Sequence, residues 1–204
     1  GLLTYTKADI LEIKKELGIP EDKIVILYMP TYRAFTKDKK NNLYVAPPIN
    51  LQYWKKALGN QYVVLFRLHY LVEKQLDIPN DGFSYSVTKY PKLNDLYAVA
   101  DILISDYSSA FFDYSILERP MLCFPYDKKD YIKHTGLYMG LEKLPCKIAE
   151  NENDLVAALT QIDYKKVSER VAEFKKEYAP KAGCAGDIVI KEVIKQINDV
   201  LSEK

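Results

Sequence analysis

The residues with the clearest chemical potential lie between Ala100 and Phe124, where an apolar run leads into two serines. Ile102–Ile104 is a short, unbroken apolar run, typical of a strand that is buried on both faces of a sheet. Ser108 and Ser109 follow it and are typical of a helix start, where free backbone N–H groups and the helix dipole attract an anion. The segment therefore predicts a phosphate site at the end of a buried strand.

An aspartate follows the serines along the same predicted helix. Asp113 comes four residues after Ser109, so the two share a helix face at a rise of about 6 Å. That step is comparable to the distance from a pyrophosphate to ribose hydroxyls, and a carboxylate there would accept hydrogen bonds from the sugar. The alternative is that Ser108 only caps the helix and Asp113 only lies on its solvated side.

Two further predicted strands end in basic and hydroxyl side chains. The strands are Ile24–Met29 and Tyr62–Phe66, and open α/β sheets bind their ligands at the carboxyl ends of such strands. Arginine, histidine and helix-terminal N–H groups can neutralise a pyrophosphate without a metal. The residues expected to converge there with the serines are Thr31, Arg33, Arg67 and His69.

His69 is the predicted catalytic group. A histidine beside phosphate oxygens is driven towards its protonated form, which stabilises charge that develops on a leaving nucleotide. The alternatives are structural: Arg33 and Arg67 would be ion-pair partners, and His69 would be a core histidine bonded to a backbone carbonyl. His134 lies in a polar, helix-like stretch and is predicted to have no role.

Composition limits the classes of partner. The chain has 204 residues, of which 48% are hydrophobic, enough for one substantial core and one domain. Its 29 Lys and Arg against 28 Asp and Glu give a net charge of +1, so no overall field attracts nucleic acid or an anionic membrane. Recognition must therefore depend on local sites.

The cysteines and the apolar segments indicate the compartment. Cys123, Cys146 and Cys184 are odd in number and widely separated, which predicts neither a disulfide framework nor a zinc site and favours a reducing cytosol. No apolar stretch approaches membrane-spanning length, and the first residues do not resemble a signal peptide. The visible chain is therefore expected to be soluble.

Strand and helix patterns alternate along the chain, which predicts a parallel sheet covered by helices on both faces. Thr6 and Asp9 form a capping-box pattern that opens the first helix, and Gly18 is expected to end it. Ala34–Pro48 has no sustained period and is predicted to be a long excursion outside the core. We expect a single Rossmann-like domain over residues 1–204, with the helices of 152–204 packing on the sheet.

Several segments together resemble the CDP-glycerol glycerophosphotransferases, which make polymers of the teichoic-acid type. The most specific is Asp106–Ser109 with Asp113 following, whereas the others are persuasive only in combination. The resemblance runs in order along nearly the whole chain. The remaining matching segments are Met29–Arg33, Arg67–His69, Leu93–Tyr97, Ala100–Phe124, Tyr126–Tyr131, Gly136–Tyr138 and, weakly, Gly183–Asp187.

The resemblance implies the C-terminal half of a GT-B architecture, with the acceptor-binding N-terminal lobe absent from this chain. The implied donor is CDP-glycerol or a similar CDP-activated polyol. A glycerol hydroxyl of a growing polyol-phosphate polymer would attack the distal phosphorus of the donor and release CMP, with the general base on the other lobe. No cofactor and no metal-binding residue is implied, and the resemblance leaves open whether the reaction requires a metal. The full-length protein is expected in the cytoplasm at the inner face of the bacterial membrane, which it contacts only through parts outside this chain.

By the same similarity, seven residues would contact the donor or line its cleft. Arg67 and His69 would face the diphosphate, Ser108 and Ser109 the phosphates at the helix start, and Asp113 the ribose. Thr31 and Arg33 would line the cleft.

Two departures and two alternatives accompany this hypothesis. Cys146 stands after Pro145 where the family commonly has glycine, so the shape of that loop is expected to differ. Tyr70 stands after His69 where many relatives have proline, so the turn that directs the imidazole is expected to differ too. One alternative is a related transferase that uses CDP-ribitol or a nucleotide sugar. The other is a non-catalytic nucleotide-binding or interaction domain.

Overall fold

The structure is a computed structural model that describes residues 1–33, 35, 47–73 and 76–202, so most of the predicted excursion at Ala34–Pro48 lies outside the described residues. Its centre is a parallel sheet of six strands in the order β3-β2-β1-β4-β5-β6. The strands are β1 (Ile24–Tyr28), β2 (Tyr62–Phe66), β3 (Ser84–Ser86), β4 (Ile102–Ser105), β5 (Met121–Cys123) and β6 (Lys147–Ile148).

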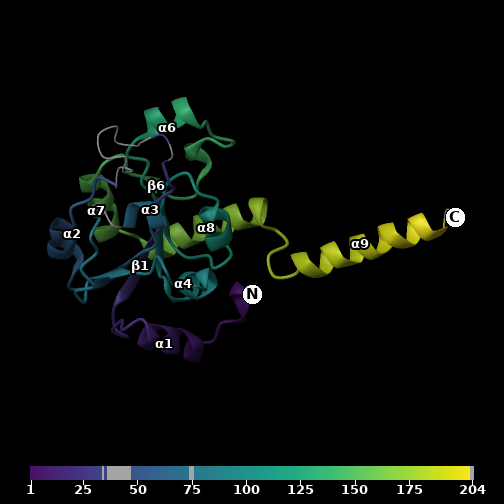
Figure 1. Ribbon diagram of the computed structural model, residues 1–204, viewed down its shortest axis with the longest axis horizontal. Coiled ribbons are helices and arrows are strands. Elements are labelled where there is room, and N and C mark those ends of the chain that lie inside the picture. Colours follow the sequence, from purple (N-terminus) through teal and green to yellow (C-terminus); the bar gives the residue numbers. More distant parts are fainter. Residues whose placement is uncertain (34, 36–46, 74–75, 203–204) are drawn as a thin grey trace.

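Helices connect the strands and flank the sheet (Figure 1). They are α1 (Lys7–Glu16), α2 (Leu51–Leu58), α3 (Tyr70–Glu73), α4 (Leu93–Val99), α5 (Ala110–Ser115), α6 (Lys128–His134), α7 (Glu152–Thr160), α8 (Tyr164–Tyr178) and α9 (Ala185–Ser202), with short 3₁₀ turns at Leu2–Thr4 and Leu141–Lys143.

The start and end of α1 follow the sequence prediction. The hydroxyl of Thr6 accepts a hydrogen bond from the backbone of Asp9, and the Asp9 carboxylate accepts one from the backbone of Thr6, so the capping box is formed. After the helix, Gly18 adopts a φ of 68°, a conformation that favours glycine.

Two apolar clusters occupy the two faces of the sheet. Alternate residues of β1 point to opposite sides, with Val25 and Leu27 in one cluster and Ile26 and Tyr28 in the other. Helices α1, α4, α5 and α8 contribute buried side chains to the first cluster, and α2 and α7 to the second. The predicted α/β fold, a parallel sheet flanked by helices, is confirmed.

The strand order places a topological switch point between β1 and β4. From β1 the chain proceeds outward to β2 and β3, and it then returns to the other side of β1 to build β4, β5 and β6. At such a point the two loops that leave neighbouring strands diverge and open a crevice. Thr31 and Arg33 follow β1, and Ser108 and Ser109 follow β4, so both groups lie beside this crevice.

Some elements differ from the sequence prediction. Strand β6 was not expected, because Lys147–Ile148 is too short to form an apolar run, and it pairs with β5 at the edge of the sheet. Helix α3 is described over Tyr70–Glu73; part of the expected helix through Leu76 lies outside the described residues, and Leu76 itself is in a bend.

The packing expected for the helices of residues 152–204 does not extend to α9. Helices α7 and α8 bury Leu155, Leu159 and Val171 completely, whereas the large apolar side chains of α9 are between 43% and 63% exposed. Figure 1 shows α9 extending away from the sheet and its flanking helices. The turn before it contains Gly183 with a φ of 91°, which directs the chain outward. None of the described helices is long and apolar enough to span a membrane.

Removal of the Trp54 side chain should destabilise the fold strongly. Trp54 on α2 is fully buried, and its ring lies 5.9 Å from that of Tyr28 and 6.3 Å from that of Phe66. Trp54→Ala should lower the free energy of unfolding by about 3–5 kcal/mol because it leaves a cavity. Chemical denaturation measures this, with Leu11→Ala at a 45% exposed position as the control. Equal losses in the two variants would contradict the assignment of Trp54 to the core.

Candidate functional site

Asp106 joins the two strands at the switch point. It follows β4, is 1% exposed, and accepts hydrogen bonds at Oδ1 from the backbone N–H groups of Thr31 at 2.9 Å and Tyr107 at 2.7 Å. Nearby, the hydroxyl of Ser105 donates to the carbonyl of Met29 at 2.6 Å. These bonds fix the segment that leaves β1 against the turn that leaves β4.

Arg33 extends this connection to the segment after β5. Its guanidinium donates to Asp106 Oδ2 at 2.7 Å, and to Asp127 through Nε at 2.6 Å and Nη2 at 2.9 Å. The same group also donates to the carbonyl of Thr31. Arg33 is only 3% exposed and Asp106 is buried with it, while the Asp127 side chain is 13% exposed. Arg33 therefore holds three strand exits together, which is the ion-pair role that the sequence left open for it.

Three tyrosine rings surround the Arg33 guanidinium. Its Cζ lies 4.8 Å from the ring centroid of Tyr107, 5.1 Å from that of Tyr131 and 5.2 Å from that of Tyr126. The rings of Tyr107 and Tyr131 stack with centroids 3.7 Å apart, and the Tyr107 hydroxyl donates to Asp127 Oδ1 at 3.1 Å. The cation, which comes from the β1 exit, thus fixes aromatic side chains of the segments that follow β4 and β5.

The charges in this cluster follow from burial and pairing. Burial raises the pKa of Asp106, and the Arg33 charge and the Thr31 donors oppose that change. Burial opposes the charge on Arg33, but its bonds to Asp127 and Asp106 raise its pKa overall. Burial also raises the pKa of Tyr126 to about 12. At neutral pH the guanidinium is therefore charged and the tyrosine hydroxyl is protonated.

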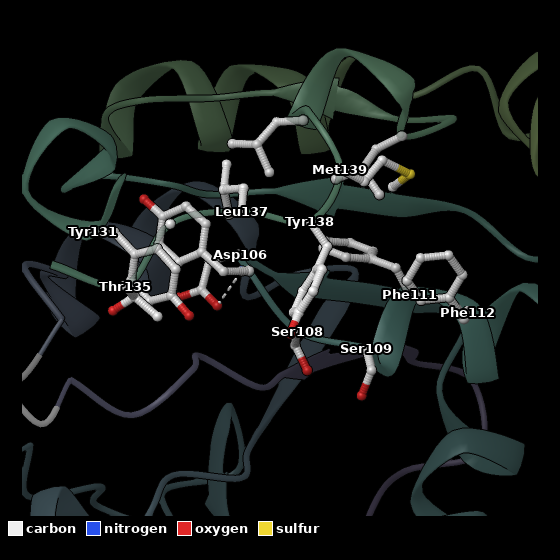
Figure 2. A pocket seen from close by; sticks show the side chains of 14 residues that line it. Asp106, Ser108, Ser109, Phe111, Phe112, Tyr131, Thr135, Leu137, Tyr138 and Met139 are labelled. Atoms are coloured by element: carbon white, nitrogen blue, oxygen red, sulfur yellow. Dashed lines mark hydrogen bonds between the residues drawn. The ribbon is translucent and has the colours of Figure 1, made fainter. Parts of the chain in front are cut away.

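A pocket of about 560 Å³ opens beside this cluster (Figure 2). The turn after β4 contributes one wall, and residues from α6 to the following 3₁₀ turn contribute another. In Figure 2, Tyr131 and Thr135 lie on one side of the pocket, and Phe111, Phe112 and Met139 on the other. The lining residues are Asp106, Tyr107, Ser108, Ser109, Phe111, Phe112, Tyr131, Thr135, Gly136, Leu137, Tyr138, Met139, Leu141 and Leu144.

The predicted serine pair lies at this pocket and begins α5. Ser108 Oγ accepts a hydrogen bond from the backbone N–H of Ala110 at 3.1 Å, so Ser108 does cap the turn, as the structural alternative expected. Ser109 is the residue before the helix, is exposed, and lines the pocket. The hydroxyl of Ser109 is therefore accessible to a ligand, whereas that of Ser108 already accepts one bond.

His69 lies across the crevice, after β2. Its ring is stacked with that of Tyr32 at a centroid distance of 4.2 Å, and its ring centroid lies 4.6 Å from that of Tyr70. The backbone carbonyl of His69 accepts from Val72 at 2.9 Å and so starts α3. The side chain is half-buried, which places it at the boundary between the core and the crevice.

Arg67 and Asp113 lie in a common neighbourhood around Tyr97. Arg67 Nη1 donates to the carbonyls of Tyr90 at 2.8 Å and Val87 at 3.3 Å, and so fixes the segment that follows β3. Burial raises the pKa of Tyr97, the Asp113 charge raises it further, and the Arg67 charge lowers it. Asp113 is exposed on α5 and is not among the residues that line the pocket.

The structure thus places six of the predicted residues just after the carboxyl ends of three adjacent strands, β2, β1 and β4, and the seventh, Asp113, on α5. Thr31 and Arg33 contact Asp106 directly, and the serines share its turn. Sequence reasoning missed the roles of Asp106 and Asp127 as partners of Arg33. The available signal was that each acid comes just after a buried strand, where a charge needs a partner. The described residues contain no cluster of three or more His, Cys, Asp or Glu side chains able to hold a metal.

A comparison with protein families agrees with the resemblance in the sequence. Residues 1–182 match the family described as CDP-Glycerol:Poly(glycerophosphate) glycerophosphotransferase. The chain belongs to this family. Curated relatives are between 30% and 41% identical to the chain over 71% to 91% of its length.

Two of these relatives are named for glycerol phosphate. The teichoic acid poly(glycerol phosphate) polymerase of Bacillus subtilis strain 168 is 41% identical over 159 residues, which are 75% of this chain and 21% of the relative. The teichoic acid glycerol-phosphate transferase of Staphylococcus aureus strain NCTC 8325 is 39% identical over 153 residues, which are 74% of this chain and 39% of the relative. The chain therefore spans less than half the length of these glycerophosphotransferases.

Solved structures confirm the fold. The wall teichoic acid polymerase TagF superposes with a TM-score of 0.80 at 33% identity, over 96% of this chain and 49% of that chain. A UDP-GlcNAc 2-epimerase from Neisseria meningitidis, at 17% identity and a TM-score of 0.55, shares the fold over 91% of this chain and 48% of its own.

Removal of the Arg33 charge should lower the denaturant concentration at which the chain unfolds. In Arg33→Met, Asp106 and Asp127 lose their buried counter-charge, so the free energy of unfolding should fall by about 3–5 kcal/mol. Chemical denaturation at pH 7 measures the loss. Lys176→Met, which removes an exposed pair with Glu173, serves as the control and should leave the midpoint unchanged. An Arg33→Met midpoint equal to that of the parent would show that the Arg33 ion pairs do not stabilise the fold.

Proposed function

We propose that the full-length protein transfers glycerol phosphate from CDP-glycerol to a growing polyol-phosphate polymer and releases CMP, and that this chain provides the donor-binding surface. Family membership and the relatives named for poly(glycerol phosphate) support this reaction class. A variant of the TagF polymerase that was soaked with CDPG superposes on this chain with a TM-score of 0.79. The single observation that carries the proposal is the Asp106–Ser109 turn beside an open pocket at the switch point.

In this proposal the donor diphosphate lies against the turn after β4. The exposed Ser109 hydroxyl and the backbone of the turn donate to phosphate oxygens, while Ser108 shapes the turn through Ala110. Asp113, one helical turn further along α5, accepts from the ribose hydroxyls. Arg67 and His69 approach from β2 and supply positive charge. Thr31 and Arg33 contribute indirectly, because both are bonded to Asp106 and fix the turn.

The chemistry is a phosphoryl transfer. An acceptor hydroxyl attacks the phosphorus of the glycerol phosphate, a new P–O bond forms, and the P–O bond to CMP breaks with its electron pair going to the departing phosphate. His69 stabilises the charge that develops on that leaving group. The acceptor loses its proton to a general base, which we place on the N-terminal lobe.

The partners and location follow the same proposal. An N-terminal lobe outside this chain would bind the polymer acceptor and close the cleft over the donor. The full-length protein would work in the cytoplasm at the inner face of the membrane, and the contact with lipid would come from other parts of the protein.

A second donor is favoured by a specific observation. The ribitol-phosphate polymerase TarL of Staphylococcus aureus strain NCTC 8325 is 32% identical over 169 residues, which are 80% of this chain and 29% of the relative. CDP-ribitol shares the nucleoside diphosphate with CDP-glycerol, so the residues described above would accept either donor. Discrimination between the two donors must therefore depend on contacts with the polyol group.

Calorimetric titration of this chain with CDP-glycerol, CDP-ribitol, CMP and UDP-glucose tests the proposal. CDP-glycerol should bind most tightly, and Ser109→Ala should weaken it by about 10- to 150-fold, the value of one hydrogen bond to a charged oxygen. Ser168→Ala on α8 is the matched control and should bind as the parent does. Binding of none of the four nucleotides would favour the interaction-domain alternative, and tighter binding of CDP-ribitol would identify the second donor.

Asp113→Asn should reduce discrimination between ribose and deoxyribose ligands. A carboxylate accepts from both ribose hydroxyls more strongly than an amide does, so the preference for CDP over 2′-deoxy-CDP should fall by about threefold or more. Asp199→Asn, on the exposed α9, controls for the lost charge. If the parent chain binds the two ligands equally, Asp113 does not contact the ribose.

A further inference from the structure

Tyr32 is a residue of the site for which no role was predicted. It lies between Thr31 and Arg33, in the segment that leaves β1. Its ring faces that of His69, with centroids 4.2 Å apart and planes 22° apart, which is a stacked geometry. The contact joins the exit of β1 to the exit of β2, so both rings lie on the β1 side of the crevice.

The backbone that carries Tyr32 is held on both sides. The N–H of Thr31 donates to Asp106, and the Arg33 side chain donates to Asp106 and Asp127. Because Asp106 and Arg33 are nearly fully buried, these bonds leave the short segment between them little freedom. The backbone at Tyr32 is therefore anchored by the same ion pair that fixes the serine turn, and its ring presents a platform to His69.

We propose that Tyr32 is a positioning residue: its ring sets the orientation of the His69 imidazole towards the donor diphosphate, and thereby couples the histidine to the Arg33–Asp106 pair. This inference rests on the proposed function, because it concerns how His69 is aimed at a phosphate. Tyr32 touches no reacting atom and acts through His69. Tyr70, whose ring centroid is 4.6 Å from that of His69, is 68% exposed and provides a less enclosed contact.

Proton NMR tests the stack without any ligand. The chain has two histidines, and His134 stacks on Phe35 at 4.8 Å, so it provides an internal control. Aromatic stacking shields ring protons, and Tyr32→Leu should therefore move the His69 ring signals downfield and leave those of His134 in place. Tyr32→Phe should keep the His69 signals, and Phe35→Leu should move only those of His134. In the parent chain, nuclear Overhauser contacts should join the rings of Tyr32 and His69; their absence overturns the proposal even if a variant fails to fold.

Donor binding tests the coupling. Tyr32→Leu should weaken CDP-glycerol binding by about fivefold, the value of one aromatic pair, and Tyr32→Phe should restore it. In a His69→Ala background, Tyr32→Leu should have no additional effect, because the platform would have nothing to position. Full additivity of the two substitutions would overturn the positioning role. If His69→Ala alone leaves binding unchanged, the role proposed for His69 fails instead, and the NMR result still decides whether the stack exists.

Discussion

The buried ion pair between Arg33 and two aspartates is the interaction on which the site depends. Arg33, Asp106 and Asp127 come from segments that follow three different strands, and burial removes much of their hydration. Such a group is costly to bury unless its charges are paired and its hydrogen bonds are made, and here the guanidinium makes bonds to both carboxylates. The result is a rigid junction in the region where the topology of the sheet opens a crevice.

This junction separates the residues that hold the site from those that are available to a ligand. Asp106 and Arg33 are buried and fully engaged, whereas Ser109 and Asp113 are exposed and lie on the segment that Asp106 anchors. Pre-organisation of this kind lowers the entropic cost of binding, because the exposed hydrogen-bonding groups are already in place when a ligand arrives. Two of the aromatic rings around Arg33 also line the pocket, so the junction fixes that part of the pocket wall as well.

The sequence predicted the sheet and the edge of the site well, because unbroken apolar runs such as Ile102–Ile104 report burial on both faces directly. It predicted β6 poorly, since a two-residue edge strand carries too little pattern. The role of Arg33 was left open because an arginine after a strand has the same local sequence whether it faces a ligand or a buried acid. The pairing with Asp127 depends on residues 94 positions apart, and no local rule contains that information. The outward course of α9 could not be predicted either. An amphipathic pattern indicates that one face of a helix packs against an apolar surface, but it does not indicate which surface that is.

The long sequence separation of these contacts has a consequence for folding. Thr31 meets Asp106 across 75 positions and Arg33 meets Asp127 across 94, so the crevice does not exist until both halves of the sheet have formed around β1. No local fragment of the chain holds the parts of the site together. A donor that binds there is therefore linked to the cooperative unfolding of the whole sheet, and its occupancy should slow hydrogen exchange in the central strands as well as in the loops that touch it.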